Sequence, residues 1–265
     1  MIAFDHPQEI RDIYLVGAGG TGGHLARTVA RLVYDMRQKR LSAPHIHFVD
    51  PDTVEMKNVG RQMFIPADVG QYKAEVLATR LNRALGLDIA YHIAAFHPDM
   101  VQHSHASLII GAVDNHLARK AIAQIKGALW IDSGNERHNG QVVIGNCGDP
   151  QDVIQQYDYA DYYGEDETTK LPHVGVIFPD ILEPPPAPVL AAPEASCADL
   201  VQMDEQSLFV NEWMAMVTTQ YVDHVLRRQP IKSLMTFVDV QAMVVKPVPL
   251  TRSNLLFYCG LHQYT

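Results

Sequence analysis

The chain has 265 residues, of which 47% are hydrophobic and 19% charged, and its formal net charge is −9. Such a length and composition predict one large or two small domains around an apolar core. The acidic balance disfavours nucleic acid as a partner, and no apolar run approaches the roughly 20 residues that cross a membrane. The N-terminus lacks the basic and apolar regions of a signal peptide, so we expect a cytoplasmic protein.

The first half of the chain alternates strand-like and helix-like segments. An apolar strand from Ile13 leads into a glycine-rich turn at 17–23 and a helical run to Arg37. Further strands are predicted at 45–50, 88–96, 107–113 and 128–134, and further helices at 70–85 and 115–127. This alternation predicts an α/β, Rossmann-like fold with a doubly wound, mostly parallel sheet. The apolar segment 141–147 is expected to begin an antiparallel extension toward the C-terminus.

The pattern changes after Gly148. Residues 149–200 combine an acidic, Tyr-rich stretch with a proline-rich one, and we expect them to form a flexible crossover loop within a single domain that spans 1–265. A long helix is predicted at 204–228, where an acidic start and a basic end suit the helix dipole. Two or three closing strands are expected after it, including one at 254–260.

The glycine-rich turn predicts a nucleotide site. Its glycines, Gly17, Gly19, Gly20 and Gly22, let phosphate oxygens approach backbone amide groups at a helix N-terminus. Asp50, at the end of the second strand, is placed to accept hydrogen bonds from ribose hydroxyls. A nicotinamide-dependent oxidoreductase would share both features, so that alternative stays open at this point.

The segment after Asp50 favours a triphosphate. Polar side chains lie close together in it, at Asp52, Asn58, Arg61 and Gln62, and Lys73 follows a short turn. Arg61 and Lys73 supply the cations that a triphosphate and its leaving pyrophosphate require, and Asn58 supplies a hydrogen-bond donor. Asp114, after the strand at 107–113, is placed to hold a magnesium ion. These residues favour ATP and Mg²⁺ over a nicotinamide.

Four segments carry a resemblance to a known family. They read IYLVGAGGTGG, FVDPDTVEMKNVGRQ, DVGQYKAEVLATRLN and GAVDNHLARKAI, in this order, within residues 12–146. Together they resemble the ThiF/HesA/MoeB family, the bacterial relatives of ubiquitin-activating enzymes, and the pattern D-x-D-x-V-x-x-x-N-x-x-R-Q is the most specific part. The later SCADL and QSLFVN segments resemble the branch named ThiF-related in bacterial PRTRC cassettes.

The resemblance implies an ATP-dependent adenylyltransferase that activates the C-terminal carboxylate of a small ubiquitin-like or sulfur-carrier protein. It makes the four glycines the phosphate loop, assigns ribose to Asp50 and magnesium to Asp114, and places phosphates and the acyl centre at Asn58, Arg61 and Lys73. Gln62 and Asn115 also match the motif. A homodimer, and a conjugating enzyme as a further partner, are implied as well.

Two departures from the family pattern keep alternatives open. Relatives carry an arginine in a helix before the first strand that reaches the partner subunit's site, and Arg11 lies too close to the strand to match it. A catalytically degenerate, partner-binding module is therefore a further alternative. The paired CxxC motifs of many relatives are missing too, so no zinc is expected.

The cysteines are far apart in the sequence, at Cys147, Cys197 and Cys259. Cys147 and Cys259 lie in apolar, strand-like contexts that predict core positions. Cys197 follows the proline-rich stretch, and a helix start there would favour its thiolate. The resemblance allows Cys197 to form a thioester with the partner, and a packed structural cysteine is the alternative.

Overall fold

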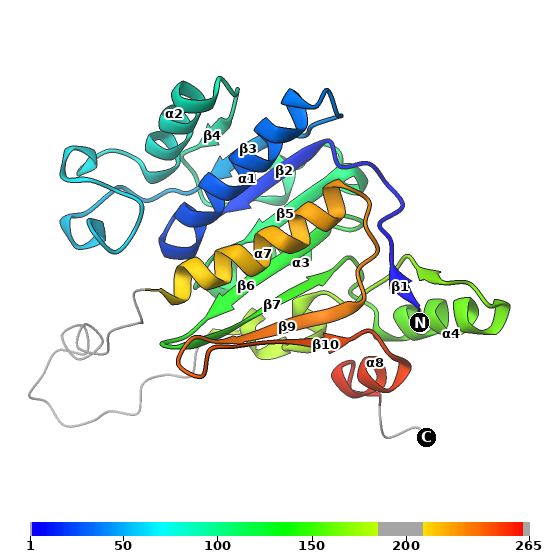
Figure 1. The fold of residues 1–265 in the computed structure, drawn as a ribbon. Coiled ribbons are helices and arrows are strands. Elements are labelled where there is room, and N and C mark those ends of the chain that lie inside the picture. Colours follow the sequence, from blue (N-terminus) through cyan, green and yellow to red (C-terminus); the bar gives the residue numbers. More distant parts are fainter. Residues whose placement is uncertain (1, 185–208, 262–265) are drawn as a thin grey trace, which may run out of the picture.

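An eight-stranded sheet runs through the structure in the order β10-β9-β7-β6-β5-β2-β3-β4 (Figure 1). The computed structural model describes residues 2–184 and 209–261. Its strands are β2 (Asp12–Val16), β3 (His45–Val49), β4 (Ala90–His92), β5 (Ser107–Gly111), β6 (Leu129–Asn135), β7 (Asn139–Gly145), β9 (Ser233–Asp239) and β10 (Val244–Pro249). A small parallel pair joins β1 (Ala3–Phe4) to β8 (Glu167–Thr168).

The sheet is parallel from β4 to β6 and antiparallel from β6 to β10. This confirms the predicted fold class, a mostly parallel sheet with an antiparallel extension. β2 lies between β3 and β5 with Val16 paired to both Val49 and Gly111. Sequence order reverses around β2, and a crevice at the carboxyl ends of the strands is where such sheets bind ligands. The central parallel strands β2 and β5 are almost continuously apolar because both of their faces are buried.

Helices cover both faces of the sheet. The helices are α1 (Gly20–Gln38), α2 (Lys73–Leu85), α3 (His116–Ala123), α4 (Pro150–Tyr163), α5 (Val174–Ile177), α7 (Val210–Leu226) and α8 (Arg252–Tyr258). A Cβ added to Gly134 would approach Arg119 of α3, whereas one added to Gly140 would meet Met214 of α7. Gly134 is paired with Gln141, the chain neighbour of Gly140. Paired residues share a face and chain neighbours point to opposite faces, so Gly134 and Gly140 lie on opposite faces of the sheet. The sheet is therefore doubly wound.

Short 3₁₀ helices connect the longer elements. They are η1 (Met56–Asn58), η2 (Pro66–Asp68), η3 (Pro98–Met100), η4 (Ser104–Ala106) and η5 (Pro179–Leu182). Helix α1 packs against both α2 and α7 (Figure 1). Within the described residues, no helix has the length and apolar character needed to span a membrane.

The prediction of a crossover loop from residue 149 is wrong for residues 150–163, which form α4. Asp149 caps this helix by accepting hydrogen bonds from the amides of Gln151 (2.9 Å) and Asp152 (3.4 Å), and Gly164 ends it in a left-handed conformation (φ +71°). Val153, Tyr157 and Ala160 are buried at helical spacing. The cap and this apolar stripe outweigh the acidic, Tyr-rich composition. Residues 185–200 of the predicted loop lie outside the described part.

The prediction of a closing strand at 254–260 is also wrong, because this segment forms α8. The Thr251 hydroxyl caps it by accepting a hydrogen bond from the Asn254 amide at 3.3 Å. Cys259 ends the helix and is buried, which agrees with its predicted core position, whereas Cys147 is only half-buried just after β7.

One buried and three half-buried histidines predict an acid-sensitive fold. Burial lowers the pKa of His6, His24, His47 and His173. His173 also caps α5, since its Nδ1 accepts a hydrogen bond from the Gly175 amide at 3.1 Å. The unfolded chain, with histidine pKa values of about 6.5, takes up protons first as the pH falls, so stability should decline below about pH 6.5.

We expect His173→Asn to make this decline shallower, because asparagine can cap the helix but does not titrate. The free energy of unfolding from urea titrations at pH 7.5, 6.5 and 5.5 measures the slope. An equally steep decline in the variant would contradict the assignment of His173 as a contributor.

Candidate functional site

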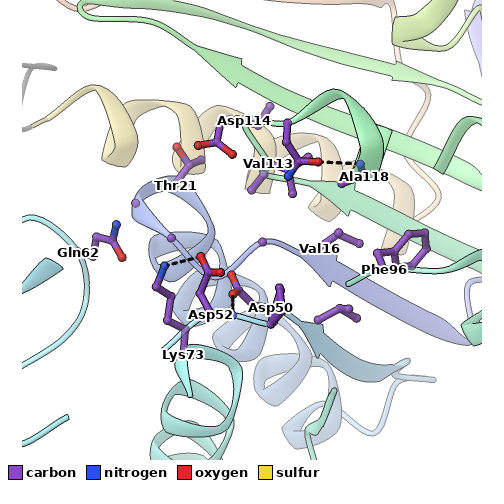
Figure 2. Close-up of a pocket in the computed structure, with 18 of the residues that line it drawn as sticks. Val16, Thr21, Asp50, Asp52, Gln62, Lys73, Phe96, Val113, Asp114 and Ala118 are labelled. Atoms are coloured by element: carbon purple, nitrogen blue, oxygen red, sulfur yellow. Dashed lines mark hydrogen bonds and ion pairs between the residues drawn. The ribbon is translucent and has the colours of Figure 1, made fainter. Parts of the chain in front are cut away.

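A cavity of about 1070 Å³ opens at the carboxyl ends of β2, β3, β5 and β6 (Figure 2). The structure brings nearly all the predicted binding residues to its wall: Gly17, Gly19, Gly20, Asp50, Asp52, Asn58, Arg61, Gln62, Lys73, Asp114 and Asn115. Only Gly22 of the predicted set is not part of the lining. The cavity is at the upper end of the volumes of small-molecule sites.

The glycine-rich turn is formed by close backbone contacts. Gly17 has a φ of +94°, and a Cβ there would overlap the carbonyl oxygen of Ala112. A Cβ on Gly22 would overlap the carbonyl oxygen of Gly17, so Gly22 lets α1 pack against the turn instead of lining the cavity. Among the described residues the first backbone hydrogen bond of α1 runs from Gly23 to Gly19 (2.8 Å). The preceding amide groups can therefore bind an anion.

Asp50 holds the turn in place. Its Oδ2 accepts a hydrogen bond from the Ala18 amide at 2.6 Å and its Oδ1 accepts one from the Asp52 amide at 2.8 Å. Burial raises the pKa of Asp50, and these two backbone hydrogen bonds oppose the shift. Each carboxylate oxygen can accept a second hydrogen bond, so the predicted contact with ribose is compatible with this geometry.

Lys73 is a cation held at the cavity wall. It is the first residue of α2, its side chain is 9% exposed, and its Nζ lies 3.0 Å from Oδ2 of the exposed Asp52 (Figure 2). The Lys73 amide also donates to the carbonyl oxygen of Asp52 at 2.9 Å. The ammonium group of Lys73 is buried and the carboxylate of Asp52 is exposed, so Lys73 can also bind an anionic ligand in the cavity.

The loop of η1 presents three more polar groups. Asn58 is buried, and its Oδ1 accepts a hydrogen bond from the Glu55 amide at 2.8 Å, which leaves its amide nitrogen as a donor. Arg61 is exposed and forms no ion pair within the described part of the chain. The buried Oε1 of Gln62 has no hydrogen-bond partner among the described residues. Such a buried, unpaired acceptor beside a cavity fits a site that a polar ligand completes.

Asp114 and Asn115 follow β5 and differ in role. The Asn115 side chain caps α3 by accepting a hydrogen bond from the Ala118 amide at 2.8 Å. Asp114 is exposed at the cavity wall. The described residues contain no group of three or more His, Cys, Asp or Glu side chains arranged to hold a metal. Magnesium is commonly held by one or two carboxylates together with substrate phosphates, so Asp114 fits that role only beside a bound nucleotide.

Sequence reasoning missed several residues that line the cavity: Phe96, Arg119, Ser133, Asn135 and Asn211. The sequence could have indicated Arg119, because it lies four residues after Asn115. One helical turn separates the two residues, so both lie on the same side of α3. Its Nε donates to Oδ1 of the buried Asp132 at 3.2 Å. Asn135 carries no such signal, and Asn211 ends the QSLFVN segment without any local indication that it reaches this cavity. Only the tertiary fold brings β6 and α7 to the glycine-rich turn.

In both cysteines of the described part, burial disfavours the thiolate, which is the nucleophilic form. Burial raises the pKa of Cys147, and it raises that of Cys259 to about 11. Cys197, the predicted thioester residue, lies outside the described residues.

The profile of the ThiF family matches residues 8–227. NEDD8-activating enzyme E1 catalytic subunits are similar to the chain: the Saccharomyces cerevisiae protein is 32% identical over 133 residues, and the Drosophila melanogaster protein 30% identical over 115 residues. These matches cover 47% and 42% of the chain but only 40% and 23% of the relatives. The chain thus spans less than half the length of either relative.

Three crystal structures share the fold. E. coli MccB with MccA-N7isoASN has a TM-score of 0.57 at 14% identity, covering 94% of this chain and 67% of MccB. PaaA has a TM-score of 0.55 at 15% identity, covering 91% and 73%. E. coli MccB with AMPCPP and MccA has a TM-score of 0.53 at 13% identity, covering 91% and 64%.

Arg119 is expected to contribute strongly to stability. Arg119→Met would leave the Asp132 carboxyl group buried without its partner, at a cost of about 3 to 5 kcal/mol. The double variant Arg119→Met/Asp132→Asn should recover much of the loss, because no charge then remains buried. Urea titrations of both variants measure the free energy of unfolding. Equal losses in both would show that the burial of an unpaired charge is not the cause.

Proposed function

The chain belongs to the ThiF family, and on that premise we propose that it uses ATP to adenylate the C-terminal carboxylate of a small ubiquitin-like or sulfur-carrier protein. One observation carries this proposal: the cavity gathers a glycine-rich turn at a helix N-terminus, the cations Arg61 and Lys73, and the carboxylate of Asp114. A triphosphate requires this combination of backbone donors, cations and a carboxylate for its metal. A nicotinamide dinucleotide does not require the cations Arg61 and Lys73.

The lining suggests where each part of the ligands would lie. The amides of the turn and the N-terminus of α1 would hold the phosphates. Apolar side chains at Val49, Phe96 and Val113 line the cavity as well and would contact the base. Asp50 would accept from ribose, and Asp114 would hold Mg²⁺ together with phosphate oxygens. The cavity of about 1070 Å³ leaves room for the end of a polypeptide beside the nucleotide.

In the proposed reaction, a carboxylate oxygen of the substrate attacks the α-phosphorus of ATP. A bond forms between these atoms, the bond from the α-phosphorus to the oxygen bridging to the β-phosphate breaks, and acyl-adenylate and pyrophosphate result. Arg61 and Lys73 would neutralise charge that moves to the pyrophosphate, and Asn58 would donate a hydrogen bond to a phosphate or to the attacking carboxylate. Alignment and charge stabilisation suffice, so no protein nucleophile takes part in this step.

The relatives support the substrate class. The two E1 subunits are named for NEDD8 activation, and the MccB structures hold MccA, in one case with the ATP analogue AMPCPP. Our proposal extends to a cytoplasmic homodimer, to membership of the PRTRC branch, and to a thioester on Cys197 that passes the activated protein to a conjugating enzyme. A reducible conjugate that is lost in Cys197→Ser, with adenylation retained, would support that last step.

ATP–pyrophosphate exchange tests the adenylation step. We expect exchange that depends on one of a set of candidate small proteins ending in Gly-Gly. Arg61→Ala and Asp114→Ala should each lower it about 100-fold or more, the scale of losing a charge-stabilising group. Their melting temperatures should not change, since both side chains are exposed.

Lys39→Ala is the matched control, because this exposed lysine pairs, among the described residues, only with Asp35 on α1 and does not line the cavity. Unchanged exchange in both Arg61→Ala and Asp114→Ala would overturn the site assignment. Saturable NAD binding without ATP binding would favour an oxidoreductase, and ATP binding without exchange would favour a degenerate binding module.

A further inference from the structure

A polar cluster from three elements closes one side of the cavity. Thr21 comes from the first turn of α1, Asn135 from the end of β6 and Asn211 from the first turn of α7. The Thr21 hydroxyl donates to Oδ1 of Asn211 at 2.9 Å, and Nδ2 of Asn135 donates to the same oxygen at 3.1 Å. All three residues line the cavity, and Figure 1 shows the first turns of α1 and α7 beside each other.

The Asn211 carboxamide lies directly against the glycine-rich turn. A Cβ on Gly20 would be 2.7 Å from Nδ2 of Asn211 and 2.9 Å from its Cγ. A side chain at this position would have to displace the Asn211 carboxamide, so the glycine is what allows this approach. Gly20 is the first residue of α1 and lines the cavity, and the first amide groups of a helix have no intrahelical partners.

The hydrogen bonds fix the orientation of the Asn211 amide. Both cluster donors point at Oδ1, which leaves the two N–H groups of Nδ2 as the available donors of this side chain. Within the described residues, no hydrogen bond from Nδ2 is present. A donor in this position extends the row of backbone amides at the N-terminus of α1, where an anion is favoured by the helix dipole.

We infer that Asn211 is a nucleotide-binding residue, with Nδ2 donating a hydrogen bond to the phosphate chain of ATP at the N-terminus of α1. Thr21 and Asn135 are positioning residues that hold the amide in this orientation. The inference rests on the proposed function, because it takes the ligand of the cavity to be ATP. It adds a contact from α7, outside the four segments within residues 12–146 that resemble the ThiF/HesA/MoeB family.

Equilibrium binding to the full chain tests this inference, with AMPCPP and Mg²⁺ as one probe and adenosine as the other. Asn211→Ala should weaken AMPCPP binding about tenfold to a hundredfold, the range for a lost hydrogen bond to a charged group. Asn211→Asp, nearly the same size, should weaken it further because a carboxylate repels phosphate. Adenosine binding should not change in either variant.

The variant Thr21→Val tests whether the orientation of the Asn211 amide matters, separately from its direct contact with the nucleotide. It keeps Asn211 but removes one of the two hydrogen bonds to Oδ1, so a smaller loss of AMPCPP affinity is expected, again without a change for adenosine. Melting temperatures within a few degrees of the parent chain show that each variant is folded, and Thr21→Val carries the test if Asn211→Ala does not fold.

The outcomes for the inference and for the proposed function differ. Unchanged AMPCPP affinity in Asn211→Asp, or equal losses for AMPCPP and adenosine, would overturn the assignment of Asn211 to the phosphates and leave the proposed function intact. No AMPCPP binding by the parent chain would overturn the proposed function, and the inference with it.

Discussion

The site depends on the contact between the first turn of α1 and the end of β2. Gly22 packs on the carbonyl oxygen of Gly17, and Gly17 packs on that of Ala112 after β5, with no room for a Cβ at either position. The Asp50 carboxylate holds this turn through the Ala18 amide. The N-terminus of α1 is thereby fixed at the point where sequence order reverses in the sheet, and the other cavity residues are arranged around it.

Much of the fold followed from local patterns. Apolar segments bounded by turns gave the parallel strands, and their alternation with amphipathic segments gave the layers, because a parallel sheet needs helical crossovers. Asp50 and Asp114 were predicted to bind ribose and magnesium from positions after two strands, and the carboxyl ends of parallel strands lie at one edge of the sheet. The structure places them at one cavity. Their chemical roles remain predictions.

Other parts could not be read from the sequence for identifiable reasons. Composition suggested a loop at residues 150–163, where the structure has α4. Only three residues of this helix, Val153, Tyr157 and Ala160, are buried, and so short a stripe is a weak periodic signal. The apolar run at 254–260 is too short to distinguish a strand from a helix by periodicity. The contact of Asn211 with Thr21 joins residues 190 positions apart, and no local pattern encodes such a pairing.

That long-range contact has a thermodynamic consequence. If the nucleotide binds to the amide of Asn211 as well as to the turn of α1, it binds only the form of the protein in which α7 is docked. Ligand concentration then shifts the equilibrium between docked and undocked α7, with a free energy that grows as the logarithm of the concentration over the dissociation constant. The hydrogen-exchange protection of α7 and the saturation of the cavity would in this way report on the same equilibrium.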